Sequence, residues 1–135
     1  MKRSESREHI FKILFGVEFA EGEELSSQIA LYAEEELEGA KEAEIAYIRD
    51  KAMKVAEKLP EIDEILAANS KGWKTTRMNK VDLSIMRLAV YEMKWDEDVP
   101  SGVAINEAVE LAKKYSSDQG PAFVNAVLGK ITKLQ

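Results

Sequence analysis

The sequence lacks cysteine altogether and has one histidine and three prolines in 135 residues. Without cysteine, the chain has no disulfide framework and no thiolate metal site, which fits a reducing compartment. No apolar run approaches the ~18–20 residues of a membrane-spanning helix, and the polar start does not lead into the apolar core of a signal sequence. We therefore expect a protein of the cytoplasm.

Sequence patterns of known active sites are missing as well. The chain has no HExxH, GxGxxG, P-loop or GxSxG pattern. His9 flanks an apolar stripe, which is typical of a structural or surface histidine. The glutamates of residues 34–38 are most simply a solvated helix face, and "EIDE" at 61–64 is only a weak candidate for metal binding. The sequence predicts a non-enzymatic protein with no catalytic residue, cofactor or metal.

What the sequence does contain is helical periodicity along its whole length. Apolar residues recur three or four positions apart, and the alternation of a half-buried strand is absent. Helices are expected at residues 4–22, 24–39, 43–60, 60–69, 79–95, 105–115 and 120–134. About seven helices with short links predict an all-α protein, arranged as helical bundles.

A polar stretch at residues 68–77, which contains Gly72, is the one plausible internal division. The net charge of −6 argues, taken alone, against nucleic acid, but its distribution is uneven. Residues 21–70 carry fourteen acidic and five basic side chains, a net of −9, and the rest carry a net of +3. We expect an N-terminal helical subdomain at residues 1–70 and a C-terminal one at 71–135, which offer different surfaces to partners.

The segment at residues 79–95 is apolar on two sides, so we expect a central helix with Leu88 deeply buried. Arg87 lies beside this stripe, and a cation near a core needs a carboxylate partner. We expect the partner on the next helix, at Glu107 or Glu110.

Basic side chains gather at the start of the chain, at Lys2, Arg3 and Arg7. If Ser4 caps the first helix, Arg7 lies on an exposed first turn. Helix N-termini and basic side chains both attract phosphate. This cluster is therefore a candidate for nucleic-acid binding.

A second basic and aromatic group follows near the other end of the chain. Lys113 and Lys114 precede Tyr115, and Phe123 comes shortly afterwards. Basic groups beside aromatic rings suit single-stranded RNA, whose bases are free to stack. The alternative is that both rings belong to the core and that the lysines are solvated helix ends.

Two asparagines lie inside apolar helical segments. Asn106 falls at the expected first turn of its helix, where an amide can bond to the backbone of the preceding connector. Asn125 is one residue off the apolar stripe of its helix, so we expect it to face outward and to serve recognition.

Long stretches of the chain resemble the NusB family of bacterial transcription antitermination factors. The resemblance lies in "VDLSIMRLAVYEM", "DVPSGVAINEAVELAKKY" and "FVNAVLGKI". It continues in "SREHIFKILFGVEF" near the start and in "GWKTTR" at residues 72–77. These motifs follow the family's order and span almost the whole chain.

This resemblance implies an RNA-binding protein of two helical subdomains. Members of the family pair with NusE, a small-subunit ribosomal protein, and together they bind the boxA element of nascent RNA. The complex travels with RNA polymerase and suppresses termination, notably during ribosomal RNA synthesis. The matching RNA-binding positions are Arg3, Arg7, Phe15, Phe123 and Asn125, to which the basic cluster adds Lys2. The NusE surface is expected on the C-terminal subdomain around Asp82.

The chain departs from the family pattern at several of these positions. "RSESR" separates Arg3 from Arg7 with less basic residues, Phe15 stands where tyrosine is frequent, and "FVNA" replaces the usual "FVNG". Fewer cationic contacts predict weaker RNA binding and a smaller dependence on salt.

Two alternatives remain open at the level of sequence. A helical RNA-binding module precedes some ribosomal RNA methyltransferases, but this chain is short and has no glycine-rich cofactor loop. The other alternative is a purely structural protein-interaction bundle without RNA contacts. The sequence also leaves the oligomeric state open, including a homodimer, because some relatives dimerise in a way that covers the RNA site.

Overall fold

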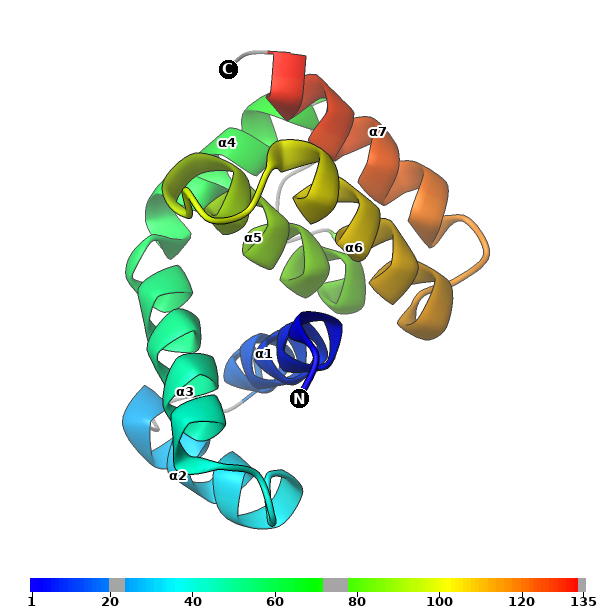
Figure 1. Cartoon of the computed structure of the whole chain (residues 1–135). Coiled ribbons are helices and arrows are strands. Elements are labelled where there is room, and N and C mark those ends of the chain that lie inside the picture. Colours follow the sequence, from blue (N-terminus) through cyan, green and yellow to red (C-terminus); the bar gives the residue numbers. More distant parts are fainter. Residues whose placement is uncertain (20–23, 72–77, 134–135) are drawn as a thin grey trace. The chain divides into compact units, whose positions relative to one another are not determined.

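The computed structural model describes residues 1–19, 24–71 and 78–133, and this part of the chain is built from helices (Figure 1). They are α1 (Arg3–Val17), α2 (Leu25–Glu36), α3 (Glu42–Glu57), α4 (Leu59–Asn69), α5 (Lys80–Trp95), α6 (Ser101–Tyr115) and α7 (Gly120–Lys133). The described residues contain seven helices and no strand. The predicted all-α class is therefore confirmed.

Two of the helix starts change how the sequence is interpreted. Helix α1 begins at Arg3 with Lys2 as its N-cap residue, so Ser4 is not the cap. Helix α6 begins before the expected Ile105, because Pro100 occupies its N-cap position, where a missing N–H is tolerated. Asn106 consequently lies beyond the first turn and is exposed. Helix α1 ends at Val17, before the expected end at Gly22, which itself lies outside the described residues.

The chain divides into two units, Met1–Glu57 and Lys58–Gln135, called unit 1 and unit 2 below. This boundary differs from the predicted one between residues 70 and 71. Helix α4 is grouped with unit 2 because it packs against α5 and α7. The polar stretch around Gly72, on which the prediction was based, lies largely outside the described residues.

Two cationic side chains also join α4 to α5. Arg87 on α5 donates from Nε to Asp63 Oδ1 at 2.9 Å and from Nη2 to Oδ2 at 2.8 Å. The Lys58 ammonium lies 5.3 Å from the centroid of the Trp95 ring at the end of α5. The predicted carboxylate partner of Arg87 is thus present, but this bidentate partner lies on α4 and not on the helix that follows α5.

Unit 1 consists of α1, α2 and α3, and α1 packs against the other two. The buried apolar side chains of its helices follow helical spacing and are Ile10, Phe11, Ile13 and Leu14 on α1, Ile29 on α2, and Ile48, Ala52 and Val55 on α3; Leu37, just after α2, is buried as well. Gly39, between α2 and α3, has φ +86°, a conformation that strains any residue with a Cβ. The glutamates of residues 34–36 are exposed, which confirms a solvated face on α2.

Unit 2 is organised around α5. The Asn79 side chain caps this helix by accepting from the N–H groups of Val81, at 2.8 Å, and Asp82, at 3.3 Å. Every residue from Asp82 to Met93 is buried, and Leu88 is 2% exposed, so the predicted central helix is confirmed. Helices α6 and α7 form an antiparallel pair, and both pack against α5 (Figure 1).

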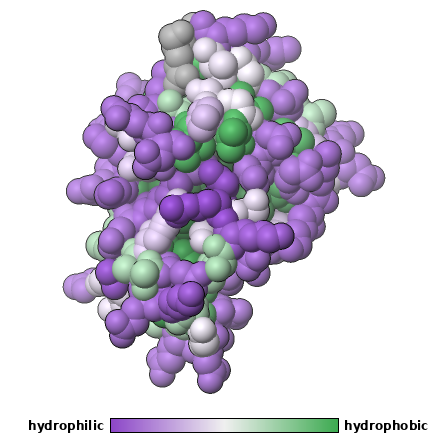
Figure 2. Space-filling view, viewed as in Figure 1, coloured by the Kyte–Doolittle hydropathy of each residue, from purple (hydrophilic) through white to green (hydrophobic). Residues whose placement is uncertain are grey.

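The surface of the chain is mainly hydrophilic on the face shown in Figure 2, where apolar side chains form only small patches. The described helices include none that is both long and apolar enough to cross a membrane.

Candidate nucleic-acid interface

The predicted site residues are divided between the two units. Unit 1 carries Lys2, Arg3, Arg7 and Phe15, and unit 2 carries Asp82, Phe123 and Asn125.

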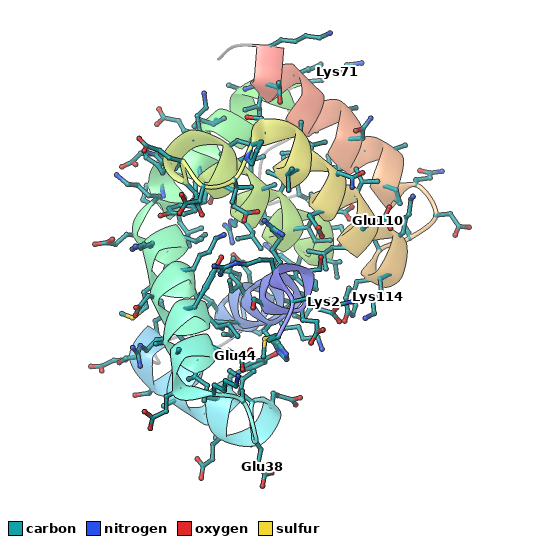
Figure 3. All side chains as sticks on the ribbon, in the orientation of Figure 1. Lys2, Glu38, Glu44, Lys71, Glu110 and Lys114 are labelled. Carbon is teal, nitrogen blue, oxygen red and sulfur yellow. The ribbon has the colours of Figure 1, made fainter. Side chains whose placement is uncertain are left out.

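In unit 1, the start of α1 presents basic side chains to solvent. Lys2 and Arg3 are exposed, as predicted, and Lys2 is labelled at this end of the helix in Figure 3. The guanidinium carbon of Arg3 lies 4.0 Å from the centroid of the Tyr47 ring on α3. On the same helix, Lys51 donates a hydrogen bond of 3.3 Å to the Tyr47 hydroxyl. The first basic residue of α1 is therefore held against an aromatic ring that is itself fixed by a lysine.

The sequence interpretation did not include Tyr47 and Lys51 in the candidate site. The available signal was their spacing, because an aromatic residue and a lysine four positions apart meet on one face of a helix. Nothing in the sequence indicated that Arg3, far away along the chain, meets the same ring. The N-terminal ammonium reinforces this arrangement, since it pairs with Glu44 on α3 at 2.5 Å.

Glu44, at the start of α3, is engaged by two hydrogen-bond donors. The hydrogen bond from the N-terminal ammonium, followed by that from the Lys41 backbone N–H, lowers the pKa of its carboxyl group. The Lys41 bond measures 3.0 Å to Oε1. Glu44 is therefore ionised and engaged by donors at the start of α3.

Arg7 does not lie on an exposed first turn, and this part of the prediction was wrong. Its side chain is only 7% exposed. Because α1 begins at Arg3, Arg7 falls on the second turn, in the stripe that continues through Ile10, Phe11 and Leu14. A long aliphatic stem allows an arginine to extend an apolar stripe in this way. Any RNA contact by Arg7 is thus restricted to the small part of its side chain that solvent reaches.

Phe15 is partly exposed in a row of aromatic residues spaced by four along α1. Its ring centroid lies 6.4 Å from that of the buried Phe11 and 4.9 Å from that of Phe19. Phe19 is 63% exposed. The row therefore runs from the core of unit 1 to the surface, where rings can stack on unpaired bases.

His9, on the same helix, is bonded to α2. Its Nδ1 lies 2.7 Å from the Tyr32 hydroxyl, and the two rings meet edge to face. Burial, followed by the charge of Lys12, lowers the pKa of His9, and the opposing effects of Glu8, Glu36 and Glu5 are smaller. A neutral histidine that tethers two helices agrees with the structural role expected from the sequence.

In unit 2, Phe123 lies between two surface hollows. One has a volume of about 260 Å³ and includes polar groups of Asn79, Asp82 and Gln119. The other has a volume of about 250 Å³ and includes Lys71 and Lys130. Phe123 lines both hollows and is half-buried, so its ring is neither a core residue nor freely exposed.

Asn125 is exposed on α7, one residue away from the buried Val124, which confirms its predicted outward orientation. At the end of α6, Lys113 pairs with Glu110 at 3.1 Å, and the Lys114 ammonium lies 5.4 Å from the ring centroid of Tyr115. Figure 3 shows Lys114 and Glu110 at the surface of unit 2. Unit 2 thus exposes lysines beside an aromatic ring at the end of α6, and an amide on α7.

Asp82, expected at the centre of a partner surface, is 6% exposed. Its Oδ1 accepts a hydrogen bond of 2.5 Å from the Ser116 hydroxyl at the end of α6. A Cβ on Gly120, the first residue of α7, would lie 2.0 Å from the Ser116 hydroxyl oxygen and 3.1 Å from Asp82 Oδ1. Asp82 therefore joins the start of α5 to the connection between α6 and α7, and its hydrogen bond helps to position that connection.

The described part of the chain contains no group of three or more histidine, aspartate or glutamate side chains placed to hold a metal ion. In the weak candidate at residues 61–64, Asp63 is engaged by Arg87.

Comparison with known proteins identifies the family. A model of the NusB family matches residues 4–133. The transcription antitermination protein NusB of Agathobacter rectalis is 51% identical over 130 residues, which are 96% of this chain and 98% of that protein. The NusB of Lachnoclostridium phytofermentans is 50% identical over 131 residues, with coverages of 97% and 98%.

Solved structures agree with this result. NusB of T. maritima superposes with a TM-score of 0.90 at 31% identity, covering 98% of this chain and 92% of that one. A crystal structure of the antitermination factors NusB and NusE in complex with dsRNA gives a TM-score of 0.86 at 25% identity, with coverages of 98% and 97%. Because the family model spans nearly the whole sequence and curated relatives match it from end to end, the chain belongs to the NusB family.

Proposed function

We propose that this protein is a transcription antitermination factor that binds single-stranded boxA RNA together with NusE. The observation that carries the proposal is the basic start of α1, where Arg3 is exposed and stacked on Tyr47, in a chain of the NusB family. A stacked guanidinium keeps its N–H edge available for a phosphate oxygen. Single-stranded RNA is favoured over a duplex because its bases can stack on exposed rings such as Phe15 and Phe19.

The further parts of the proposal follow from the family. The RNA-bound complex acts on RNA polymerase during elongation, notably on ribosomal RNA operons, and the protein works in the cytoplasm without catalysing a reaction. The relative that was solved with NusE and dsRNA supports NusE and RNA as partners, while the single-stranded form of the RNA is inferred from the exposed rings. On unit 2, we assign Phe123 and Asn125 to the RNA, and the surface around Asp82 to NusE.

The test compares single charge reversals in an RNA-binding assay over a series of salt concentrations. Arg3→Glu should weaken binding to a boxA oligonucleotide and lower the salt slope by about 0.7, the value for one phosphate contact on a single strand. Lys54→Glu is the matched control, because Lys54 is an exposed lysine of the same unit and the net charge changes equally. The control should reduce affinity less and leave the slope closer to that of the wild type.

Arg7 needs separate treatment because it is buried. Arg7→Glu places a carboxylate in the apolar stripe of α1, so its RNA affinity has to be compared at a temperature where circular dichroism shows that the variant is folded. Arg7→Met retains an apolar stem without the charge. If RNA binding survives in Arg7→Met and in Arg3→Glu alike, the N-terminal arm is not the RNA-binding element of this protein.

NusE binding serves as the independent readout. Arg3→Glu should leave the capture of NusE intact in the absence of RNA, because the expected NusE-binding surface lies on unit 2. Loss of both partners in this variant contradicts the assignment of two surfaces. If the wild type itself shows no measurable binding to RNA while it still captures NusE, a purely structural protein-interaction bundle is favoured instead. Sedimentation with and without RNA shows whether a homodimer forms and competes with the RNA.

A further inference from the structure

Tyr47 on α3 is the meeting point of two cationic side chains from different helices. The Arg3 guanidinium carbon lies 4.0 Å from the ring centroid, within the range of a cation–π contact. The Lys51 ammonium lies 5.6 Å from the same centroid and donates to the ring's hydroxyl at 3.3 Å. The ring is half-buried, whereas Arg3 is exposed.

Arg3 has no hydrogen-bond or ion-pair partner among the residues that the structure describes, so the ring is what holds its side chain. An arginine next to the end of a chain otherwise samples many rotamers, and a ligand that binds it has to restrict them. Stacking on tyrosine removes much of this freedom in advance. It occupies a face of the guanidinium and leaves the N–H edge, which is the part that binds phosphate.

We propose that Tyr47 is a positioning residue for RNA recognition, which holds the Arg3 guanidinium with its N–H edge ready for a backbone phosphate. This inference rests on the proposed function and adds to it a residue of α3. Lys51 completes the arrangement, because its hydrogen bond to the hydroxyl keeps the ring in place. In the RNA complex, Arg3 stays on the ring, and the phosphate takes the outer edge of the guanidinium.

The experiment is a double-mutant cycle between Tyr47 and Arg3, made in the full chain with its own start, because the N-terminal ammonium contacts Glu44. Affinity for a single-stranded boxA oligonucleotide is measured for Tyr47→Leu, Arg3→Ala and the double variant over a salt series. Tyr47→Leu should weaken binding about two- to fivefold, as expected for an exposed cation–π contact. Its salt slope should remain that of the wild type, because Arg3 keeps its charge and its reach.

The other variants separate positioning from general stability. Arg3→Ala should lower the salt slope by about 0.7, and Tyr47→Leu should then have no further effect. Tyr47→Phe keeps the ring but loses the hydrogen bond from Lys51, so its RNA affinity should fall between those of the wild type and Tyr47→Leu. Tyr32→Leu is the matched control, since Tyr32 is also a half-buried tyrosine of unit 1 and contacts α1 through His9. It should leave the RNA affinity unchanged.

A second measurement does not depend on whether Tyr47→Leu folds. In the wild type, Arg3 side-chain protons over the ring should show a ring-current shift in the NMR spectrum, and they should keep it when the oligonucleotide binds. Loss of that shift on binding means that RNA displaces Arg3 from Tyr47, which overturns the inference.

The affinities can overturn it in two further ways. An equal effect of Tyr47→Leu with and without Arg3 means that the ring acts independently of the arginine. Tighter binding by Tyr47→Leu means that the ring sequesters Arg3. In both cases Arg3→Ala still weakens binding, so the proposed function stands. If Arg3→Ala binds RNA as the wild type does, the N-terminal arm fails as the RNA-binding element, and this inference fails with it.

Discussion

Helix α2 of unit 1 buries a single residue, Ile29, whereas α5 of unit 2 buries every residue from Asp82 to Met93. The difference extends to the polar contacts. Unit 1 fixes its helices with contacts near the surface, such as Arg3 on Tyr47 and His9 with Tyr32. Unit 2 instead uses polar side chains of its central helix, with Arg87 bound to Asp63 and Asp82 bound to Ser116.

This contrast has a consequence for function. Exposed aromatic and cationic groups can exchange an internal contact for a ligand at little cost in stability, while buried ones cannot. The exposed groups of unit 1, such as Arg3, can therefore exchange their contacts readily. Unit 2 is suited to present a fixed surface, whose shape depends on its core.

The largest effect is expected at the core of unit 2. Leu88 is almost fully buried on α5, so Leu88→Ala should reduce the free energy of unfolding by about 2–5 kcal/mol, measured by urea denaturation. Val103→Ala on α6 is the control, because Val103 is 44% exposed and should cost below about 0.5 kcal/mol. Similar losses in the two variants would contradict the central position of α5.

This core was predictable because apolar periodicity reports directly which side of a helix is buried. The same rule misjudged Arg7, since a charged residue is assigned to the surface by default although its stem continues the stripe of Ile10 and Leu14. The boundary predicted from the polar stretch at residues 68–77 separates α4 from α5, whereas the structure groups the two helices in unit 2. Asp63 and Lys58 contact Arg87 and Trp95, which are distant in sequence, so this packing could not be predicted from the sequence.

A somewhat smaller effect is expected where the helices of unit 2 are joined. Gly120→Ala should reduce stability by about 1–3 kcal/mol, because its Cβ collides with Ser116 and disturbs the hydrogen bond to Asp82. Gly129→Ala, within the same helix, meets nothing within 4 Å and should raise stability by about 0.5–1 kcal/mol. Urea denaturation should show a lower free energy of unfolding for Gly120→Ala and a higher one for Gly129→Ala. A loss of stability in both variants would refute the prediction.

Parts of the candidate site depend on contacts that form only in the folded structure. The sequence could indicate Phe123 and Asn125 from their spacing, and the exposure of Asn125 is confirmed. It could not show that the Asp82 carboxylate accepts a hydrogen bond from Ser116, because the two residues are brought together only by the packing of α5 against α6. It also gave no sign that Arg3 meets Tyr47. Which residues bind RNA and NusE stays a prediction.

The pair between α4 and α5 should contribute less than the core. Asp63→Asn leaves Arg87 without its bidentate carboxylate and should cost about 1–2 kcal/mol, between the values for exposed and buried ion pairs. Asp50→Asn is the control in unit 1, because Asp50 pairs with Arg49 at 3.2 Å while both side chains are about half exposed. It should change stability by less than about 0.5 kcal/mol. If the two losses are equal, the boundary between the units is not explained by this pair.

The smallest effect is expected in unit 1, from His9, the one histidine of the chain. Its pKa in the folded protein is lowered from 6.5, chiefly by burial. The unfolded chain therefore takes up a proton at a higher pH than the folded one, and stability must fall as the pH drops below about 6.5. Because His9 Nδ1 lies 2.7 Å from the Tyr32 hydroxyl, charging the ring perturbs the contact between α1 and α2, so α2 should be the first helix to loosen.

The measurement compares urea midpoints of the wild type and His9→Gln at about pH 7.5 and about pH 5.5, a range in which few other groups titrate. The wild type should lose slightly more stability on acidification than the variant, and the difference should be small because the ring is only partly buried. Tyr32→Phe keeps the packing of α2 and removes the hydroxyl, which separates the effect of burial from that of the hydrogen bond. An equal or greater loss in His9→Gln would mean that His9 does not couple the two helices to pH, and the acid sensitivity of unit 1 would then have to come from its carboxylates.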